Sequence, residues 1–121
     1  MATITDNVTG QGAATITATE LTTSDDFIFK KGARQILQLA NDNGLGDVDI
    51  TIVGDEASSS VLLPGTAVTV DASAGYTFTI TDGDTVAINL QSISKYLEDS
   101  DSNPTITSSV AGVFAVLYTL V

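Results

Sequence analysis

The sequence predicts an all-β domain, a small β-sandwich or barrel of the jelly-roll kind, with one short helical turn and a flexible N-terminal arm. The chain of 121 residues suits a single domain. Threonine alternates with apolar residues in several stretches, and this period of two is typical of β-strands. Turn-forming residues separate these stretches at short intervals. Strand order does not follow from such patterns, so sandwich, jelly roll and barrel all stay open.

The N-terminal arm is predicted from composition. Residues 1–13 are small and polar and include Gly10 and Gly12, so they have too little apolar surface to fold alone. We expect an arm over 1–13 that is flexible or docked on a partner, and a single β domain over 14–121. The arm lacks the basic and apolar regions of a Sec signal peptide.

The strands of the domain are predicted where β-branched residues alternate with other types. A threonine methyl group fits a half-buried pleat, while its hydroxyl faces water or a neighbouring strand. On this criterion the expected strands are 14–19, 26–30, 34–40, 48–53, 61–63, 67–71, 76–81, 85–90 and 110–120.

Turn chemistry supports the breaks between these strands. Gly32 offers the positive φ that a tight reversal needs, and Asn43-Gly44 is the expected point of reversal in the loop 41–47. Pro64-Gly65 suits the centre of a type II turn. Asp82-Gly83-Asp84 is expected to close a short hairpin.

One segment departs from the alternation. Leu90, Ile93 and Leu97 are spaced to share one face of a helix, and Asn89 is a residue type that caps a first turn. We therefore expect one or two helical turns that cover an open end of the β structure. A strand is the rival interpretation.

The last predicted strand, 110–120, is apolar on both faces from Val113 to Tyr118. Such a strand lies between two layers of a domain, or it turns one face toward another chain. Exposed at a sheet edge, it would promote aggregation. Phe114 and Tyr118 are therefore candidate partner-binding residues.

Charge restricts the class of partner. The chain has 15 acidic and 4 basic side chains and a formal net charge of −11, which disfavours nucleic acid and anionic membranes. Lys30, Lys31 and Arg34 carry most of the positive charge in one short stretch. This basic patch either binds a carboxylate of a partner or relieves repulsion within the chain, and both interpretations stay open.

The composition excludes several kinds of chemistry. The chain contains no His, no Cys and no Trp, so zinc sites, disulfides, thiol catalysis and imidazole acid–base catalysis are ruled out. The longest apolar stretch, 110–121, is too short for a membrane helix. We predict no catalytic residue, no cofactor and no metal site, and a small hydrolase is the weakest functional hypothesis.

One acidic loop partly matches a calcium-binding motif. Asp99, Asp101 and Asn103 follow the D-x-D-x-N opening of a calcium loop. Pro104 stands where that motif needs Gly, and Val110 stands where it needs Glu. A solvated acidic loop is therefore the favoured interpretation, with loose cation binding as the alternative.

Aromatic side chains offer a second candidate surface. Phe27 with Phe29, and Tyr76 with Phe78, are spaced to share strand faces, as in an aromatic platform for sugars. Sugar platforms use exposed Trp and Tyr, and Trp is absent. Core packing is the favoured interpretation of all four rings.

The order of these features resembles the small capsid decoration (cement) proteins of tailed bacteriophages, over roughly residues 14–121. The resemblance rests on the following stretches, in order: 26–37 (DFIFKKGARQIL), the Gly/Asn hairpin, 48–55 (VDITIVGD), 63–65 (LPG), 71–76 (DASAGY), 89–97 (NLQSISKYL) and the last strand. It implies a β-sandwich or barrel without enzyme activity that binds the assembled major capsid protein, often as a trimer at threefold positions.

The expected function is therefore that of a structural virion protein. It would be made in the host cytoplasm, bind the outer surface of the capsid lattice as a homo-oligomer, with a trimer favoured, and stabilise the head. The alternative is a non-catalytic module of a phage tail or secreted protein that binds carbohydrate or a receptor. The candidate partner-binding residues are Thr9, Gln11, Lys30, Lys31, Arg34, Phe114 and Tyr118.

Overall fold

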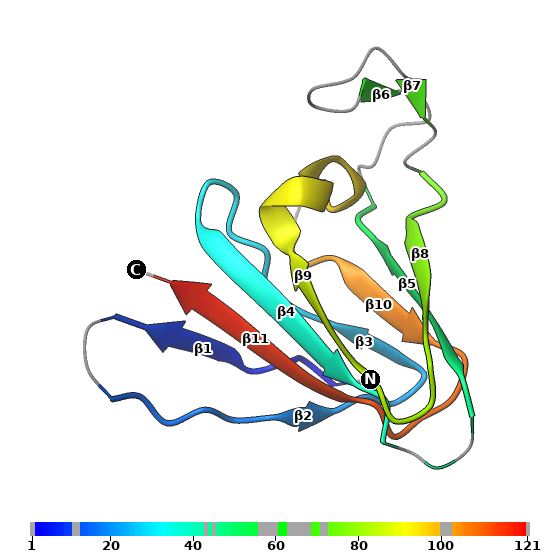
Figure 1. Ribbon diagram of the computed structural model, residues 1–121. Helices are drawn as coiled ribbons and strands as arrows, with labels where there is room; N and C mark the ends of the chain where they lie inside the picture. The colour runs from blue at the N-terminus through cyan, green and yellow to red at the C-terminus, as the bar shows by residue number, and fades with distance from the viewer. Residues whose placement is uncertain are drawn as a thin grey trace.

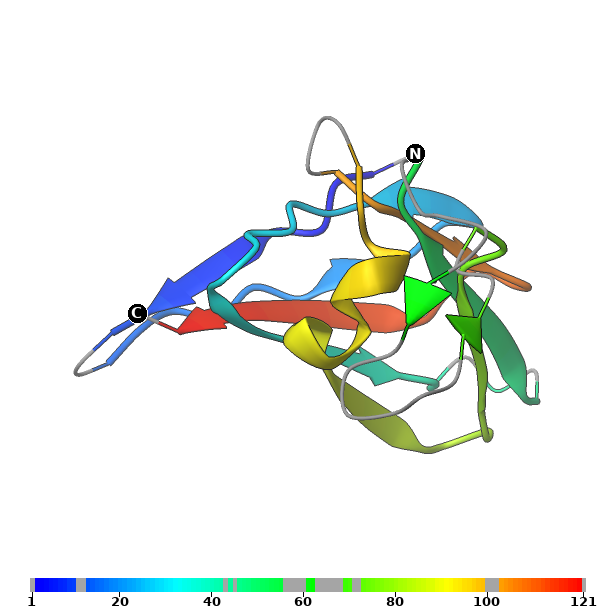
Figure 2. The same ribbon diagram turned by 90° about the horizontal axis from the view of Figure 1, so that it is seen from above.

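The computed structural model describes residues 2–10, 13–42, 44, 46–55, 61–62, 69–70, 73–99 and 103–120. Two β-sheets face each other, and a short helix lies at one end between them (Figures 1 and 2). The predicted fold class, a small all-β sandwich, is confirmed.

The first sheet is built around the last strand of the chain. Its order is β1 (Asp6–Thr9), β11 (Phe114–Leu120), β4 (Arg34–Ala40) and β9 (Thr85–Asn89), and β2 (Thr19–Glu20) also pairs with β11. β11 runs antiparallel to β4 along its whole length and parallel to β1. β11 therefore has paired neighbours on both edges and is no edge strand, but it is not covered on both faces: one face packs on the core and the other, with Phe114 exposed, turns outward.

The second sheet is antiparallel throughout. Its order is β3 (Ser24–Asp26), β10 (Thr105–Ser108), β5 (Val48–Val53) and β8 (Tyr76–Ile80). A separate two-stranded pair consists of β6 (Val61–Leu62) and β7 (Thr69–Val70).

The core between the sheets follows from the alternation in the strands. In β4, Gln35, Leu37 and Leu39 point inward and are buried, while the residues between them face outward. β5 buries Val48, Ile50 and Ile52 in the same way. The interior is closed by residues outside these strands: Ile4, Leu21, Phe27, Phe29, Leu97, Ile106 and Val113.

The predicted helical turn is confirmed as the 3₁₀ helix η1 (Leu90–Tyr96). The Asn89 side chain accepts a hydrogen bond from the backbone N–H of Gln91, which caps the first turn. Leu90, Ile93 and Leu97 are buried as the spacing predicted. The helix therefore closes one end of the sandwich, above β4 and β9 (Figure 1).

The prediction of a flexible or partner-docked N-terminal arm is wrong for residues 2–10, which join the sheet of their own chain. β1 pairs in register with β11, from Asp6 opposite Leu117 to Thr9 opposite Leu120, and Ile4 is buried in the core. Asn7 fixes this strand: its side-chain amide donates to the carbonyls of Leu117 and Thr17 at 3.0 Å each and accepts from the Thr17 N–H at 2.8 Å. Hydrogen bonds from the Asn7 side chain therefore hold the segment in place, although it has little apolar surface to bury.

A second polar cluster holds the other face of β1. Asp6 accepts from the Thr119 hydroxyl and forms an ion pair with Lys30 at 2.7 Å. Gln35 joins the same cluster: its amide donates to the Thr119 Oγ1 at 3.1 Å, and its oxygen accepts from the Lys30 N–H at 2.7 Å. Both Gln35 and Thr119 are buried, so each polar atom needs such a partner.

Several predicted strand limits are also corrected. The stretch 14–19 alternates well but is exposed, and only Thr19–Glu20 pairs. The strand predicted at 26–30 is Ser24–Asp26, and the one predicted at 110–120 begins at Phe114. β10 was not predicted, because Thr105–Ser108 is short and its neighbours are small and polar. The predictions at 63–68, 71–72 and 100–102 lie outside the described residues.

Candidate functional site

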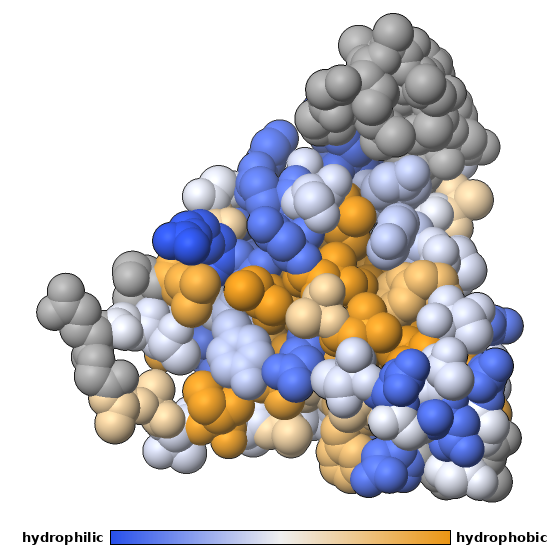
Figure 3. All heavy atoms as spheres, in the orientation of Figure 1, coloured by the Kyte–Doolittle hydropathy of each residue, from blue (hydrophilic) through white to orange (hydrophobic). Residues whose placement is uncertain are grey.

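The outward side chains of β4, β9 and β11 carry almost no charge, although the exposed Glu20 of the flanking strand β2 lies directly opposite Phe114. Strands β4, β9 and β11 turn half of their side chains away from the core, and in this set Arg34 is the only charged residue. The outward side chains are Phe114, Val116, Tyr118 and Leu120 on β11, Ile36, Gln38, Ala40 and Arg34 on β4, and Thr85, Ala87 and Asn89 on β9. Figure 3 shows hydrophobic atoms gathered across the middle of this face.

We call this set the outer face. Its apolar members are adjacent in space because the strand register places them in pairs. Phe114 lies opposite Ala40, and Tyr118 lies opposite Ile36. Side chains directly opposite on antiparallel strands contact each other, so the apolar surface is continuous from β11 to β4. The Tyr118 hydroxyl donates a hydrogen bond to the Gln38 side-chain oxygen at 3.3 Å, so these two polar side chains of the outer face pair with each other.

Phe114 is the most exposed large apolar side chain of the outer face, at 42%. A phenylalanine so placed offers contact area to a partner, although part of its ring is covered by its own chain. Substitution of Phe114 is therefore the most direct test of whether the outer face binds a partner.

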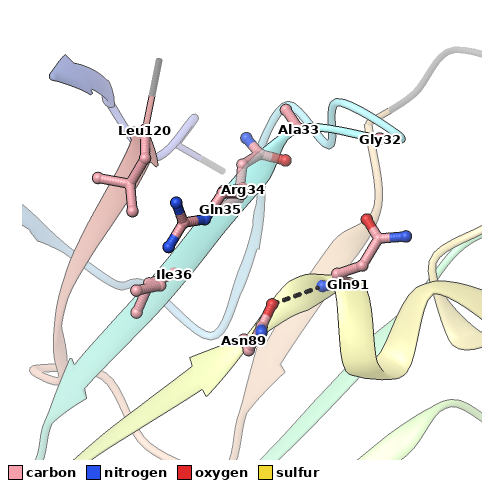
Figure 4. A pocket seen from close by; sticks show the side chains of 8 residues that line it. All are labelled: Gly32, Ala33, Arg34, Gln35, Ile36, Asn89, Gln91 and Leu120. Atoms are coloured by element: carbon pink, nitrogen blue, oxygen red, sulfur yellow. Dashed lines mark hydrogen bonds between the residues drawn. The ribbon is translucent and has the colours of Figure 1, made fainter. Parts of the chain in front are cut away.

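A hollow of about 200 Å³ lies at the opposite end of the outer face. β9 pairs with β4 only as far as Asn89 opposite Ile36, and the chain then turns into η1. Arg34 therefore has no cross-strand neighbour on that side among the described residues. The hollow is lined from β4, β9, η1, β11 and the turn before β4 (Figure 4), by Gly32, Ala33, Arg34, Gln35, Ile36, Asn89, Gln91 and Leu120.

The residues of the basic patch differ in whether they relieve repulsion within the chain or stay open to a partner. Lys30 is used within the chain, in its ion pair with Asp6. Lys31 is exposed in the turn before β4 and is not among the residues that line the hollow. Arg34 is exposed and lines the hollow, and it forms no ion pair with any described residue.

The structure brings only some of the predicted partner-binding residues together. Arg34, Phe114 and Tyr118 share the outer face. Thr9 lies beside them at the end of β1, opposite Leu120, and Gln11 lies outside the described residues. Sequence reasoning missed Ile36 and Gln38, although the same alternation that buries Leu37 required its neighbours to face outward.

The aromatic residues are packed as a core and not as a flat platform. Phe27 and Phe29 are buried. Tyr76 is half-buried against Phe78 and Tyr96, with ring centroids 5.5 and 5.7 Å apart and planes tilted by 39° and 59°. Such tilted pairs are typical of interior packing, so core packing is confirmed for Phe27 and Phe29 and favoured for the other two.

The acidic loop supplies no metal cluster in the described part of the chain, where no three His, Cys, Asp or Glu residues are grouped to hold an ion. Asp99 is used within the chain: one of its carboxylate oxygens accepts from the Asp55 N–H at 3.1 Å. No helix within the described ranges is both long and apolar enough to span a membrane.

Comparison of the chain with models of protein families, with curated proteins and with solved structures found no match. The outer face and the hollow are therefore interpreted from their own geometry.

Proposed function

We propose that this protein is a structural protein of a phage head, and that its outer face binds the outer surface of the assembled major capsid protein lattice. The observation that carries the proposal is the outer face itself: a continuous apolar surface across β11 and β4 on a chain of net charge −11, with Arg34 at one end and Glu20 of β2 beside Phe114 at the other. The resemblance of residues 14–121 to decoration proteins supports the choice of partner.

The charge distribution favours a protein partner for this face. Adjacent exposed and half-buried apolar side chains are a feature of protein contact surfaces, and interface centres are depleted of charge relative to the rest of the surface. The acidic remainder of the molecule keeps the free protein soluble and repels polyanions. A partner surface that is apolar with few charges fits the outer face best.

Binding to a lattice stabilises the head by linkage. A protein that binds the intact shell and not its ruptured form lowers the free energy of the intact shell. Because one shell offers many equivalent sites, the contacts of an oligomeric decoration protein act together and their strength multiplies. A trimer is the oligomer that the resemblance favours.

The first test is whether a major capsid gene lies beside the gene for this chain and, if it does, binding to undecorated capsids assembled from that capsid protein. We expect the purified protein to co-sediment with them and to raise the temperature or the osmotic shock at which they rupture. Saturating binding with unchanged rupture would reject the stabilising role.

A variant of the outer face sharpens this test. Phe114→Ser should weaken capsid binding by about tenfold or more, since burying a phenylalanine contributes about 1.5–3 kcal/mol. Ile28→Ser is the matched control, because Ile28 is equally exposed, at 40% against 42%, and lies outside the outer face. Equal binding by the two variants would show that this face is not the contact surface.

The alternative, a sugar- or receptor-binding module, is separated by a glycan array. A decoration protein gives no saturable signal on it. Binding that depends on Tyr76 or Tyr96 would favour the module, because these rings are only half-buried.

A further inference from the structure

We propose that the hollow beside Arg34 is a binding pocket for a single carboxylate, supplied by an aspartate or glutamate side chain of a protein partner. The inference deepens the proposed function and rests on it only for the partner's identity. The lining residues define the pocket, and its binding of a carboxylate is tested without any capsid.

The donors in the pocket match a carboxylate. Arg34 provides a planar guanidinium whose paired N–H groups fit the two oxygens of a carboxylate. Asn89 uses its side-chain oxygen to accept from the Gln91 N–H at 3.1 Å, which leaves its NH₂ group to donate outward. Gln91, at the start of η1, also lines the pocket (Figure 4).

The electrostatic setting supports an anion here and disfavours one on most of the surface. The molecule carries a net charge of −11, yet no carboxylate is found among the described residues that line the pocket. Lys30 and Lys95 each have an ion-pair partner, Asp6 and Glu98, whereas Arg34 and Lys31 have none in the part of the chain that the structure describes, and of these two only Arg34 lines the pocket. A positive charge left unpaired on so acidic a chain is available to an external anion.

The apolar residues of the pocket strengthen the binding of a carboxylate and favour a protein side chain as its source. Ile36 and Leu120 line the pocket and continue into the outer face. Charge-assisted hydrogen bonds gain strength where apolar surface excludes water. A short acidic side chain projecting from an apolar protein surface satisfies both regions at once, while a nucleic acid or an anionic membrane is repelled by the rest of the molecule.

The pocket is tested by NMR titration of the ¹⁵N-labelled protein at constant ionic strength, with N-acetyl-aspartate methylamide as the probe. The corresponding asparagine derivative serves as the neutral control. We expect saturable shifts centred on Gly32, Arg34 and Gln91 with the aspartate probe only. Inorganic phosphate and glucuronate are parallel arms, and tighter binding of either would replace the acidic side chain as the ligand.

Variants assign the shifts to Arg34. Arg34→Gln should weaken binding of the aspartate probe by about tenfold or more, and Arg34→Lys should fall between, because it keeps the charge but loses the paired geometry. Lys95→Gln is the control: it removes one positive charge from a residue that does not line the pocket. Equal weakening by Arg34→Gln and Lys95→Gln would overturn the proposal, as would equal binding of the two probes.

Capsid binding by the same variants separates the two proposals. If Arg34→Gln loses both the probe and the capsid, both stand, and the acidic side chain lies on the capsid protein. If the probe binds through Arg34 but wild-type protein does not bind capsids, the proposed function fails and the pocket remains. If the probe does not bind, the pocket is refuted whatever the capsids show.

Discussion

Gly54 shows how a single residue sets the approach of two segments. Its N–H donates to the Tyr96 carbonyl at 2.8 Å, and a Cβ at this position would lie 2.1 Å from the Glu98 carbonyl oxygen. The obstructing atoms belong to the backbone, which moves less readily than a side chain. Glycine is therefore required here to bring the end of β5 against the end of η1.

Gly54→Ala should destabilise the fold by about 3 kcal/mol, the upper end of the range for overpacking a well-packed interior. Urea unfolding followed by circular dichroism measures the change. Gly83→Ala is the control: Gly83 has φ of 85°, but no atom lies within 4 Å of the place that the added methyl group would take. Only the backbone conformation then costs energy, about 1–2 kcal/mol. A Gly54 variant no weaker than the control would contradict the close approach.

Asn7 shows that side-chain hydrogen bonds can hold a whole element. β1 is short, and Val8 within it is 52% exposed, so apolar burial alone does not keep the strand in place. The three short bonds of Asn7 join β1 to β11 and to residue Thr17. Their removal leaves the Thr17 N–H and carbonyl, which are partly buried here, and the buried Leu117 carbonyl without these partners.

Asn7→Ala should therefore cost about 2–3 kcal/mol and release β1 in particular. Hydrogen exchange should show lost protection over Asp6–Thr9 while β4 and β5 stay protected. Val8→Ala is the matched control from the same strand, with an expected change within about 0.5 kcal/mol. Uniform loss of protection in all strands would argue against a local role for Asn7.

The elements predicted best are those with strict alternation and a buried face. The limits 34–40 and 48–53 were correct, because each strand buries every second residue. The stretch 14–19 alternates equally well but pairs with another strand only at Thr19, so the alternation alone was misleading. β1 and β10 escaped prediction since one is held by polar bonds and the other is short; the pairing that decides both is remote in sequence.

The candidate site was predicted in part for a related reason. Arg34, Phe114 and Tyr118 stand out in the sequence by charge or size. That Lys30 turns to Asp6 while Arg34 does not depends on β1 joining the sheet, and composition predicted a flexible or partner-docked arm instead. The pocket depends on the point at which β9 stops pairing with β4, and neither strand pattern encodes that point.

At the scale of the whole molecule, charge repulsion opposes folding. The net charge is −11, and the described residues form only two ion pairs, Lys30 with Asp6 and Lys95 with Glu98. Compaction brings like charges together, and salt screens them over about 10 Å at 0.1 M.

Raising NaCl from low concentration to about 0.2 M should thus stabilise the protein by about 1 kcal/mol, a rise in Tm of about 4 °C for a domain of this size. Thermal unfolding by circular dichroism measures it. Tetramethylammonium chloride should give the same rise, because screening does not depend on the cation. A fall in Tm, or an effect of sodium alone, would contradict this account.

The central position of β11 has a consequence for synthesis. β1, β2 and β4 all pair with it, yet it is the last of these strands to leave the ribosome. The Asn7 side chain donates to the Leu117 carbonyl, which lies 110 residues further along the chain. The ribosome needs about 5–20 seconds to add those residues at ordinary translation rates. Until then the nascent chain keeps open strand edges that chaperones and proteases recognise. A polypeptide that terminates before Phe114 lacks the strand with which β1, β2 and β4 pair, so its first sheet cannot form.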